Sequence, residues 1–167
     1  MGTQTSSLIG VDLSGVGGTT QLFALGTPAS GTDSQEWCYV EATATFVTGE
    51  IVIVNPAGTA KTLISSLLTA NADGYDIGFC QNVISQGEFG WVAKRGRDVY
   101  VLVTGTLTAA SDNGLALGAN SGRLVAGTAG GNTLFGVVLT ESVSASGVRS
   151  VAKAVLTWPR FHTTVYS

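Results

Sequence analysis

Short stretches that alternate between apolar and polar residues, separated by glycine-rich turns, recur along most of this chain and constrain its fold most strongly. In residues 37–47 Glu41, Thr43 and Thr45 are polar, whereas the even positions are apolar: Cys38, Val40, Ala42, Ala44 and Phe46. Successive side chains of a strand point to opposite faces, so a period of two predicts a strand with one face buried. We therefore expect a buried Phe46 on the inner face of this strand.

Similar stretches follow at short spacing. We expect a strand at Glu50–Asn55, a hairpin of Tyr75–Ile84 and Glu88–Arg95 about Ser85-Gln86-Gly87, and a separate strand after Gly96. Short strands are predicted at 115–117 and 123–126, and longer ones at 97–104, 134–141 and 148–158. In the last of these, Ala152, Ala154, Leu156 and Trp158 share one face. The single helix candidate is Lys61–Ala70, with one or two turns.

Eight to ten short strands with glycine-rich turns predict an all-β fold, a single-domain β-sandwich or barrel of jelly-roll-like type. The chain of 167 residues, of which 44% are hydrophobic, is long enough for one core that buries roughly 69% of the unfolded surface. We assign residues 36–167 to this domain. Residues 1–35 are rich in Gly, Ser and Thr, with only Leu22, Phe23 and Leu25 as apolar anchors, and we read them as an extended N-terminal arm or a disordered tail.

The low charge of the chain limits the classes of partner that it can bind. Charged residues make up 11% and the net charge is −3, against about 25% charged in a typical domain. Eight Lys and Arg residues provide no basic stripe for nucleic acid. No apolar run approaches the ~18 residues of a membrane span, and the first residues lack the pattern of a secretory signal, so we expect synthesis in a cytoplasm. So few charges favour a surface partly covered in an oligomer or lattice.

No constellation for catalysis or cofactor binding is evident, so we expect neither an enzyme nor a cofactor. His162 is the single histidine, no G-x-S-x-G motif occurs, and Gly127-Thr128-Ala129-Gly130-Gly131 lacks the Lys-Ser/Thr of a phosphate loop. No cysteine–histidine cluster predicts a metal site. A glycosidase-like carboxylate pair assembled from distant strands stays open. Cys38 and Cys80 are predicted as buried thiols, and a bridge between them requires Cα atoms within ~7 Å.

Residues 88–98 form the densest cluster of aromatic and basic side chains. Alternation places Phe89, Trp91 and Ala93 on one face, while Arg95 and Arg97 flank Gly96. Trp and Arg are the usual anchors of protein interfaces. The candidate interface residues are therefore Phe89, Trp91, Arg95 and Arg97, together with Leu22 and Phe23. The alternative is a core strand with a solvated hairpin tip.

A succession of strand starts and glycines extends over roughly residues 22–160. It comprises Leu25-Gly26-Thr27, Trp37-Cys38-Tyr39-Val40-Glu41-Ala42, Gly49-Glu50-Ile51-Val52, Ile77-Gly78-Phe79-Cys80-Gln81, residues 87–96, Ser121-Gly122-Arg123-Leu124 and Leu156-Thr157-Trp158-Pro159. This succession resembles the head decoration, or cement, proteins of tailed bacteriophages. The most distinctive part is the strand Gly87–Gly96.

The resemblance implies a β-rich structural protein, commonly a homotrimer, on the exterior of a virion. Such proteins clamp neighbouring subunits of the major capsid protein and carry out no chemistry. The residues leave a second function open, a carbohydrate-binding β-sandwich module of a tail fibre or adhesion protein. Trp37, Trp91 and Trp158 could form its stacking platform, although alternation predicts that all three pack inward.

Overall fold

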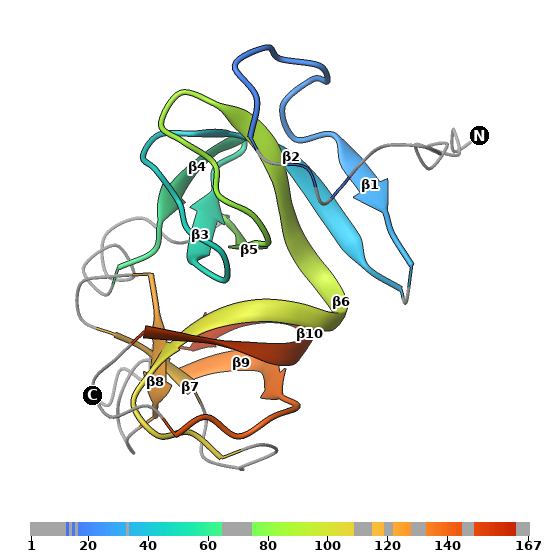
Figure 1. The fold of residues 1–167 in the computed structure, drawn as a ribbon. Coiled ribbons are helices and arrows are strands. Elements are labelled where there is room, and N and C mark those ends of the chain that lie inside the picture. Colours follow the sequence, from blue (N-terminus) through green and yellow to red (C-terminus); the bar gives the residue numbers. More distant parts are fainter. Residues whose placement is uncertain are drawn as a thin grey trace, which may run out of the picture.

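The computed structural model of this chain describes residues 13, 15, 17–32, 34–64, 75–108, 115–118, 122–127, 133–144 and 149–162. In these ranges there are ten β-strands and no helix (Figure 1). The strands are β1 (Pro28–Ser30), β2 (Glu36–Ala42), β3 (Ile51–Val54), β4 (Thr59–Thr62), β5 (Asp76–Cys80), β6 (Phe89–Thr104), β7 (Leu115–Leu117), β8 (Leu124–Ala126), β9 (Thr133–Leu139) and β10 (Arg149–His162). The predicted all-β class is confirmed.

The ten strands belong to one sheet in the order β1-β2-β4-β3-β5-β6-β10-β9-β7-β8, with further pairings of β2 with β6 and of β6 with β8. These two pairings close the sheet twice. Strands β2, β4, β3, β5 and β6 form one closed circuit, which we call the first barrel. Strands β6, β10, β9, β7 and β8 form the second barrel. Closure satisfies backbone groups that would otherwise lie at free edges.

The long strand β6 is shared by the two barrels and bends between them (Figure 1). Two residues at the bend have positive φ, Gly96 at 131° and Asp98 at 53°. A Cβ atom on Gly96 would lie 2.4 Å from Cγ of Gln35, so only glycine fits there. The sequence predicted two strands separated at Gly96, but the structure has one bent strand because its backbone continues to pair on both sides of the bend.

Two hydrophobic clusters fill the molecule. The interior of the first barrel contains Cys38, Val40, Val52, Cys80 and Val92, with Phe46 and Ile84 joined across an isolated bridge. A larger cluster combines outward side chains of the first barrel, such as Ile51 and Phe79, with the interior of the second, such as Leu134 and Leu156. Both faces of β3 are buried because one face lines the first barrel and the other belongs to the larger cluster. The predicted burial of Phe46 is confirmed, with an exposed fraction of 0%.

The described part of the predicted N-terminal arm lies on the first barrel. Strand β1 pairs antiparallel with β2, placing Ala29 opposite Trp37, and Gly18 forms a bridge with Phe89. Phe23 and Leu25 pack against the larger cluster. From residue 17 onward this segment therefore covers the outer face of β2 and β6. Residues 1–12 lie outside the described ranges.

Several local expectations can now be compared with the structure. The hairpin of β5 and β6 is confirmed, with Phe79 opposite Ala93 and Cys80 opposite Val92. The predicted helix is wrong at its start, because Lys61 and Thr62 belong to β4 and pair with β3, whereas residues 65–70 lie outside the described ranges. Cys38 and Cys80 are buried free thiols, as expected.

Candidate functional site

Three of the six predicted interface residues belong to an aromatic cluster over the first barrel. The ring of Phe23 lies 5.2 Å from that of Tyr39 and 5.4 Å from that of Trp91, and the Tyr39 ring is 6.3 Å from that of Phe89. Trp91 has an exposed fraction of 7%. These side chains hold the N-terminal segment on the barrel, so Trp91 in particular offers little surface to a partner.

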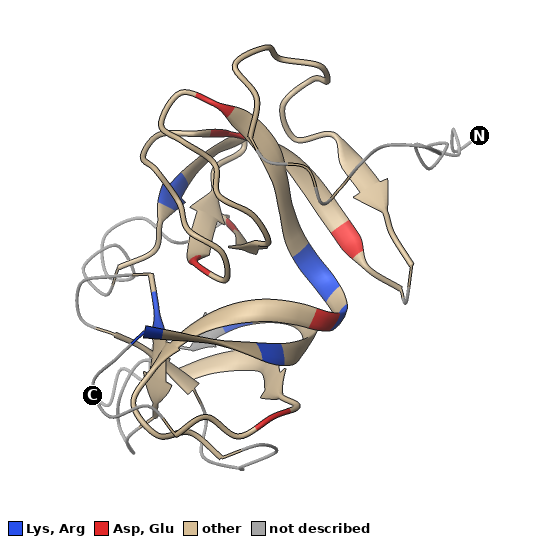
Figure 2. Cartoon of the chain, viewed as in Figure 1, with Lys and Arg blue, Asp and Glu red and all other residues tan. Residues whose placement is uncertain are grey.

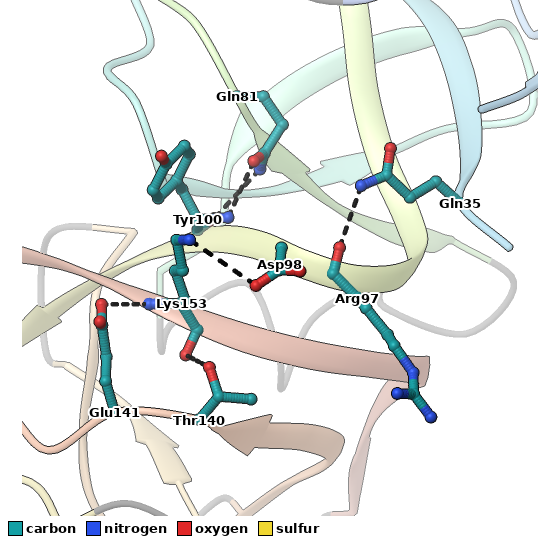
Figure 3. Close-up of polar contacts among 8 residues, drawn as sticks. All are labelled: Gln35, Gln81, Arg97, Asp98, Tyr100, Thr140, Glu141 and Lys153. Carbon is teal, nitrogen blue, oxygen red and sulfur yellow. Dashed lines mark hydrogen bonds and ion pairs between the residues drawn. The ribbon is translucent and has the colours of Figure 1, made fainter. Parts of the chain in front are cut away.

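Of the other three predicted interface residues, Arg95 and Arg97 lie together at the bend of β6, whereas Leu22 lies on the N-terminal segment. Leu22 is 73% exposed, and its backbone N–H donates to the hydroxyl of Tyr39. Arg97 is exposed, and its carbonyl accepts a hydrogen bond from the side-chain amide of Gln35 at 3.0 Å (Figure 3). Arg95 pairs with Glu36 at 2.9 Å. An interface role for these six residues stays a prediction.

Four further exposed apolar side chains lie on strands of the second barrel. Tyr100 of β6, Phe135 and Val138 of β9, and Val151 of β10 are 42%, 50%, 50% and 43% exposed. Their strands are neighbours, because β10 pairs with β6 on one side and with β9 on the other. These four side chains alternate with buried neighbours such as Val101 and Ala152, so they point out of the second barrel, where Lys153 lies opposite Tyr100 and Arg160 opposite Phe135. We call this set the outer apolar face.

Polar contacts hold the backbone of the outer apolar face in place (Figure 3). The side-chain amide of Gln81 donates to the carbonyl of Tyr100 at 3.0 Å and accepts from its N–H at 2.8 Å. On the other side of β6, the N–H of Lys153 donates to Glu141 at 2.8 Å, and its ammonium lies 3.7 Å from Asp98. The face is therefore a fixed surface of paired strands.

A second candidate lies at the open end of the first barrel. A pocket of about 380 Å³ is lined there by residues from β1, β2, β5, β6, the β3–β4 turn and β10. Cys38 and Val54, which belong to the barrel interior, lie in its wall. Glu36, Asp76 and Lys94 also line it. In its own strand, each of these residues lies two positions away from a residue that faces the barrel interior. We call this pocket the barrel mouth.

Opposite charges meet at the barrel mouth. Lys94 forms an ion pair with Asp76, and Arg95 forms one with Glu36. Figure 2 shows the basic segment of β6 next to the acidic segment of β2, close to the bend of β6. The charges within each pair neutralise one another, so the rim of the mouth has polar groups of both signs and no net charge.

Trp158 of β10 reaches the barrel mouth from the second barrel. It was expected to face inward with Ala152, Ala154 and Leu156. These three are buried, but Trp158 is 52% exposed, so that prediction is wrong for Trp158. The register of β10 against β9 shifts between Leu156 and Arg160, and Trp158 has a φ of 57°. A bulge reverses the alternation of a strand, which turns the indole outward.

Gly136 of β9 makes the bulge at Trp158 possible. A Cβ atom on this residue would lie 2.6 Å from the carbonyl oxygen of Thr157 and 3.0 Å from that of Trp158. The φ of Gly136 is 79°, a conformation that only glycine adopts without strain. Outside the bulge, the Trp158 ring is flanked by Lys94 Nζ and Arg95 Cζ, each 5.8 Å from its centroid. The other two tryptophans, Trp37 and Trp91, are buried as expected.

Cys38, Cys80 and Glu50 are titratable groups that lie buried in the interior. Burial raises the pKa of the Cys38 thiol, with Lys94 acting in the opposite direction. Burial also raises the pKa of Cys80 well above its ordinary value. Both thiols therefore stay protonated and unreactive at neutral pH. The buried carboxylate of Glu50 accepts hydrogen bonds from the N–H of Val47 and the hydroxyl of Thr62, which satisfies it structurally.

Within the same described ranges, no group of three or more His, Cys, Asp or Glu side chains is arranged to hold a metal ion. No helix there has the length and hydrophobicity to cross a membrane.

Comparison with known proteins does not assign this chain to a family. No protein-family model matches the chain, and no curated protein matches it either. Among solved structures, it is similar to the head fibre gp8.5 N base of bacteriophage phi29, at 9% identity and a TM-score of 0.44, over 75% of this chain and 97% of that one. The score and the identity are too low for this similarity to assign a function.

Sequence reasoning missed the outer apolar face and the barrel mouth for different reasons. The run Val99-Tyr100-Val101-Leu102-Val103 could have indicated the outer apolar face. Apolar residues on both faces of a strand indicate that other parts of the protein, or a partner, pack against both faces. The mouth had no such signal. Its charged side chains come from positions 36, 76 and 94, and only strand pairing brings them together.

Proposed function

We propose that this chain is a structural virion protein that binds the outer surface of a phage capsid and stabilises the lattice of major capsid subunits. The observation that carries the proposal is the outer apolar face, whose four side chains are between 42% and 50% exposed on three adjacent paired strands. Exposed apolar side chains on adjacent strands, in a protein with 11% charged residues, favour a surface that a protein partner covers. The resemblance of the strand succession to capsid decoration proteins supports the same partner.

The mechanism is thermodynamic and involves no catalysis. A protein that binds only the assembled lattice lowers the free energy of that lattice by mass action. If three copies associate, the trimer engages several capsid subunits at once, and multivalency strengthens each weak contact. Closed barrels suit this role, because closure pairs strands whose free edges could otherwise aggregate. In this proposal the protein is made in the host cytoplasm and joins the capsid from outside.

Co-sedimentation with capsids tests the proposal. Purified protein is mixed with mature and with immature capsids of the encoding phage, and we expect selective binding to one lattice state. Val138→Glu places a charge in the outer apolar face and is expected to abolish binding while the protein stays folded. The matched control is Val83→Glu, because Val83 is similarly exposed at 46% but lies before β6 on the first barrel.

Two results contradict the proposal. One is failure of the wild-type protein to bind either lattice state, and the other is equal binding by Val138→Glu and the wild type. The molar mass in solution, measured by light scattering, tests the trimer separately. A monomeric mass at all concentrations would remove the multivalent part of the mechanism.

A further inference from the structure

We propose that the barrel mouth is a binding site for a neutral saccharide, with the indole of Trp158 as its stacking platform. This inference goes beyond the capsid contact. It depends on residues that line the barrel mouth, none of which belongs to the outer apolar face.

The first argument is the position of Trp158. Its side chain is 52% exposed although it follows three buried positions of the same strand. The exposure depends on a bulge with a φ of 57° at Trp158 and on glycine at position 136. Backbone conformations of this kind persist where the surrounding structure holds them, and they gather at ligand sites. Here the strained backbone places the indole in the wall of the pocket, beside the Lys94 and Arg95 cations that lie 5.8 Å from its centroid.

The second argument is the chemistry of the rim. Glu36 and Asp76 supply carboxylate oxygens, which accept hydrogen bonds, and Lys94 supplies an ammonium group, which donates them. Sugar hydroxyls both donate and accept, so they can bridge such neighbouring groups. The acids are already paired with Arg95 and Lys94, so the rim has no net charge. A charged ligand would have to disrupt a pair, whereas a neutral polyol adds hydrogen bonds to both members.

The third argument is the shape of the site. The mouths of β-barrels are common ligand sites, and pockets of about 300–1,000 Å³ hold small molecules. The barrel mouth has a volume of about 380 Å³. Its inner wall is apolar at Val54, its rim is polar, and its aromatic side is Trp158. A pyranose ring has the matching distribution, since its C–H groups form an apolar face and its hydroxyls lie around the edge.

Glycan binding by the full-length protein tests the inference. The protein is applied to an array of neutral, sialylated and sulfated glycans, and then titrated with lactose, maltose, cellobiose and diacetylchitobiose while tryptophan emission is recorded. We expect binding to neutral glycans and a blue shift from Trp158, the exposed one of the three tryptophans. Trp158→Ala is expected to weaken binding about tenfold or more, since it removes the stacking surface.

Matched variants assign glycan binding to the barrel mouth. Val83→Ala removes an apolar side chain of comparable exposure and is expected to leave glycan binding unchanged. If Trp158→Ala unfolds, Asp76→Asn carries the same test, because it changes one acceptor of the rim and breaks its pair with Lys94. Trp158→Ala is expected to leave capsid binding intact and Val138→Glu to leave glycan binding intact, so failure of one proposal is distinguishable from failure of the other.

Three outcomes overturn the inference. They are the absence of binding to every neutral glycan, exclusive binding to sialylated or sulfated glycans, and neutral-glycan binding that neither Trp158→Ala nor Asp76→Asn reduces.

Discussion

Replacement of Phe46 by Ala measures how strongly the first barrel depends on its interior. Phe46 has an exposed fraction of 0% and is the largest side chain of the barrel's interior cluster. Its backbone N–H donates to Ile84 at 2.8 Å and its carbonyl accepts from the same residue at 3.2 Å. Because the side chain is enclosed by a closed circuit of strands, the barrel cannot collapse around a smaller residue, and a cavity remains.

The expected cost of Phe46→Ala is about 3–5 kcal/mol, the range for truncation of a buried phenylalanine. Total stabilities are about 5–15 kcal/mol, so the loss is a large part of the whole. At about 2–4 °C for each kcal/mol in a protein of this size, the melting temperature should fall by roughly 6–20 °C.

Urea unfolding followed by the emission of the buried Trp37 and Trp91 provides the assay. We expect a lower midpoint for Phe46→Ala with an unchanged slope, and for the control Val83→Ala a change within about 0.5 kcal/mol, since Val83 is exposed. A loss below about 1 kcal/mol for Phe46→Ala would refute the reasoning, because it would mean that the interior of the first barrel repacks freely.

Three further predictions address the N-terminal segment, the bulge and the thiols. Phe23→Ala should cost about 1.5–3 kcal/mol, because it removes a half-buried ring that contacts Tyr39 and Trp91; unchanged urea stability would mean that the segment is not part of the fold. Gly136→Ala should lower the free energy of unfolding by at least about 1–2 kcal/mol, because residue 136 has a positive φ, and it should change the emission of Trp158. A wild-type melting curve and emission spectrum would contradict the close approach of Gly136 to the backbone at Thr157 and Trp158. Since burial raises the pKa of Cys80 in the folded state, the folded state binds more protons above the unfolded pKa of about 8.5, and stability should fall as the pH rises past that value. Cys80→Ala should reduce this fall, and an identical pH profile for variant and wild type would argue against a buried thiol.

The strands themselves follow from the sequence. Alternation in residues 37–47 predicted a strand with an inward Phe46, and the turn at Ser85-Gln86-Gly87 predicted the hairpin of β5 and β6. These features are local, because a strand's side chains alternate wherever it pairs. The same local rule failed at Trp158, where one bulge reverses the alternation, and at Lys61, where apolar spacing suited a helix but pairing with β3 made a strand.

The candidate sites depend on pairing that no local pattern encodes. Glu36, Asp76 and Lys94 meet because β2 and β5 both pair with β6, and Trp158 joins them because β6 bends at Gly96 and continues into the second barrel. The sequence shows the chemistry of each of these side chains, but it does not show where the side chain lies in the folded protein.

By itself the sequence determined the all-β class, the positions of most strands, the burial of Phe46 and of both thiols, and the low charge of the surface, because periodicity and composition act over a few neighbouring residues. Only the tertiary structure decided that the sheet closes twice around a shared strand, that residues 17–32 cover the first barrel, and that Trp158 faces outward. Those features arise from contacts between residues far apart in the chain, together with backbone angles at single positions, and a pattern of alternating side chains contains neither.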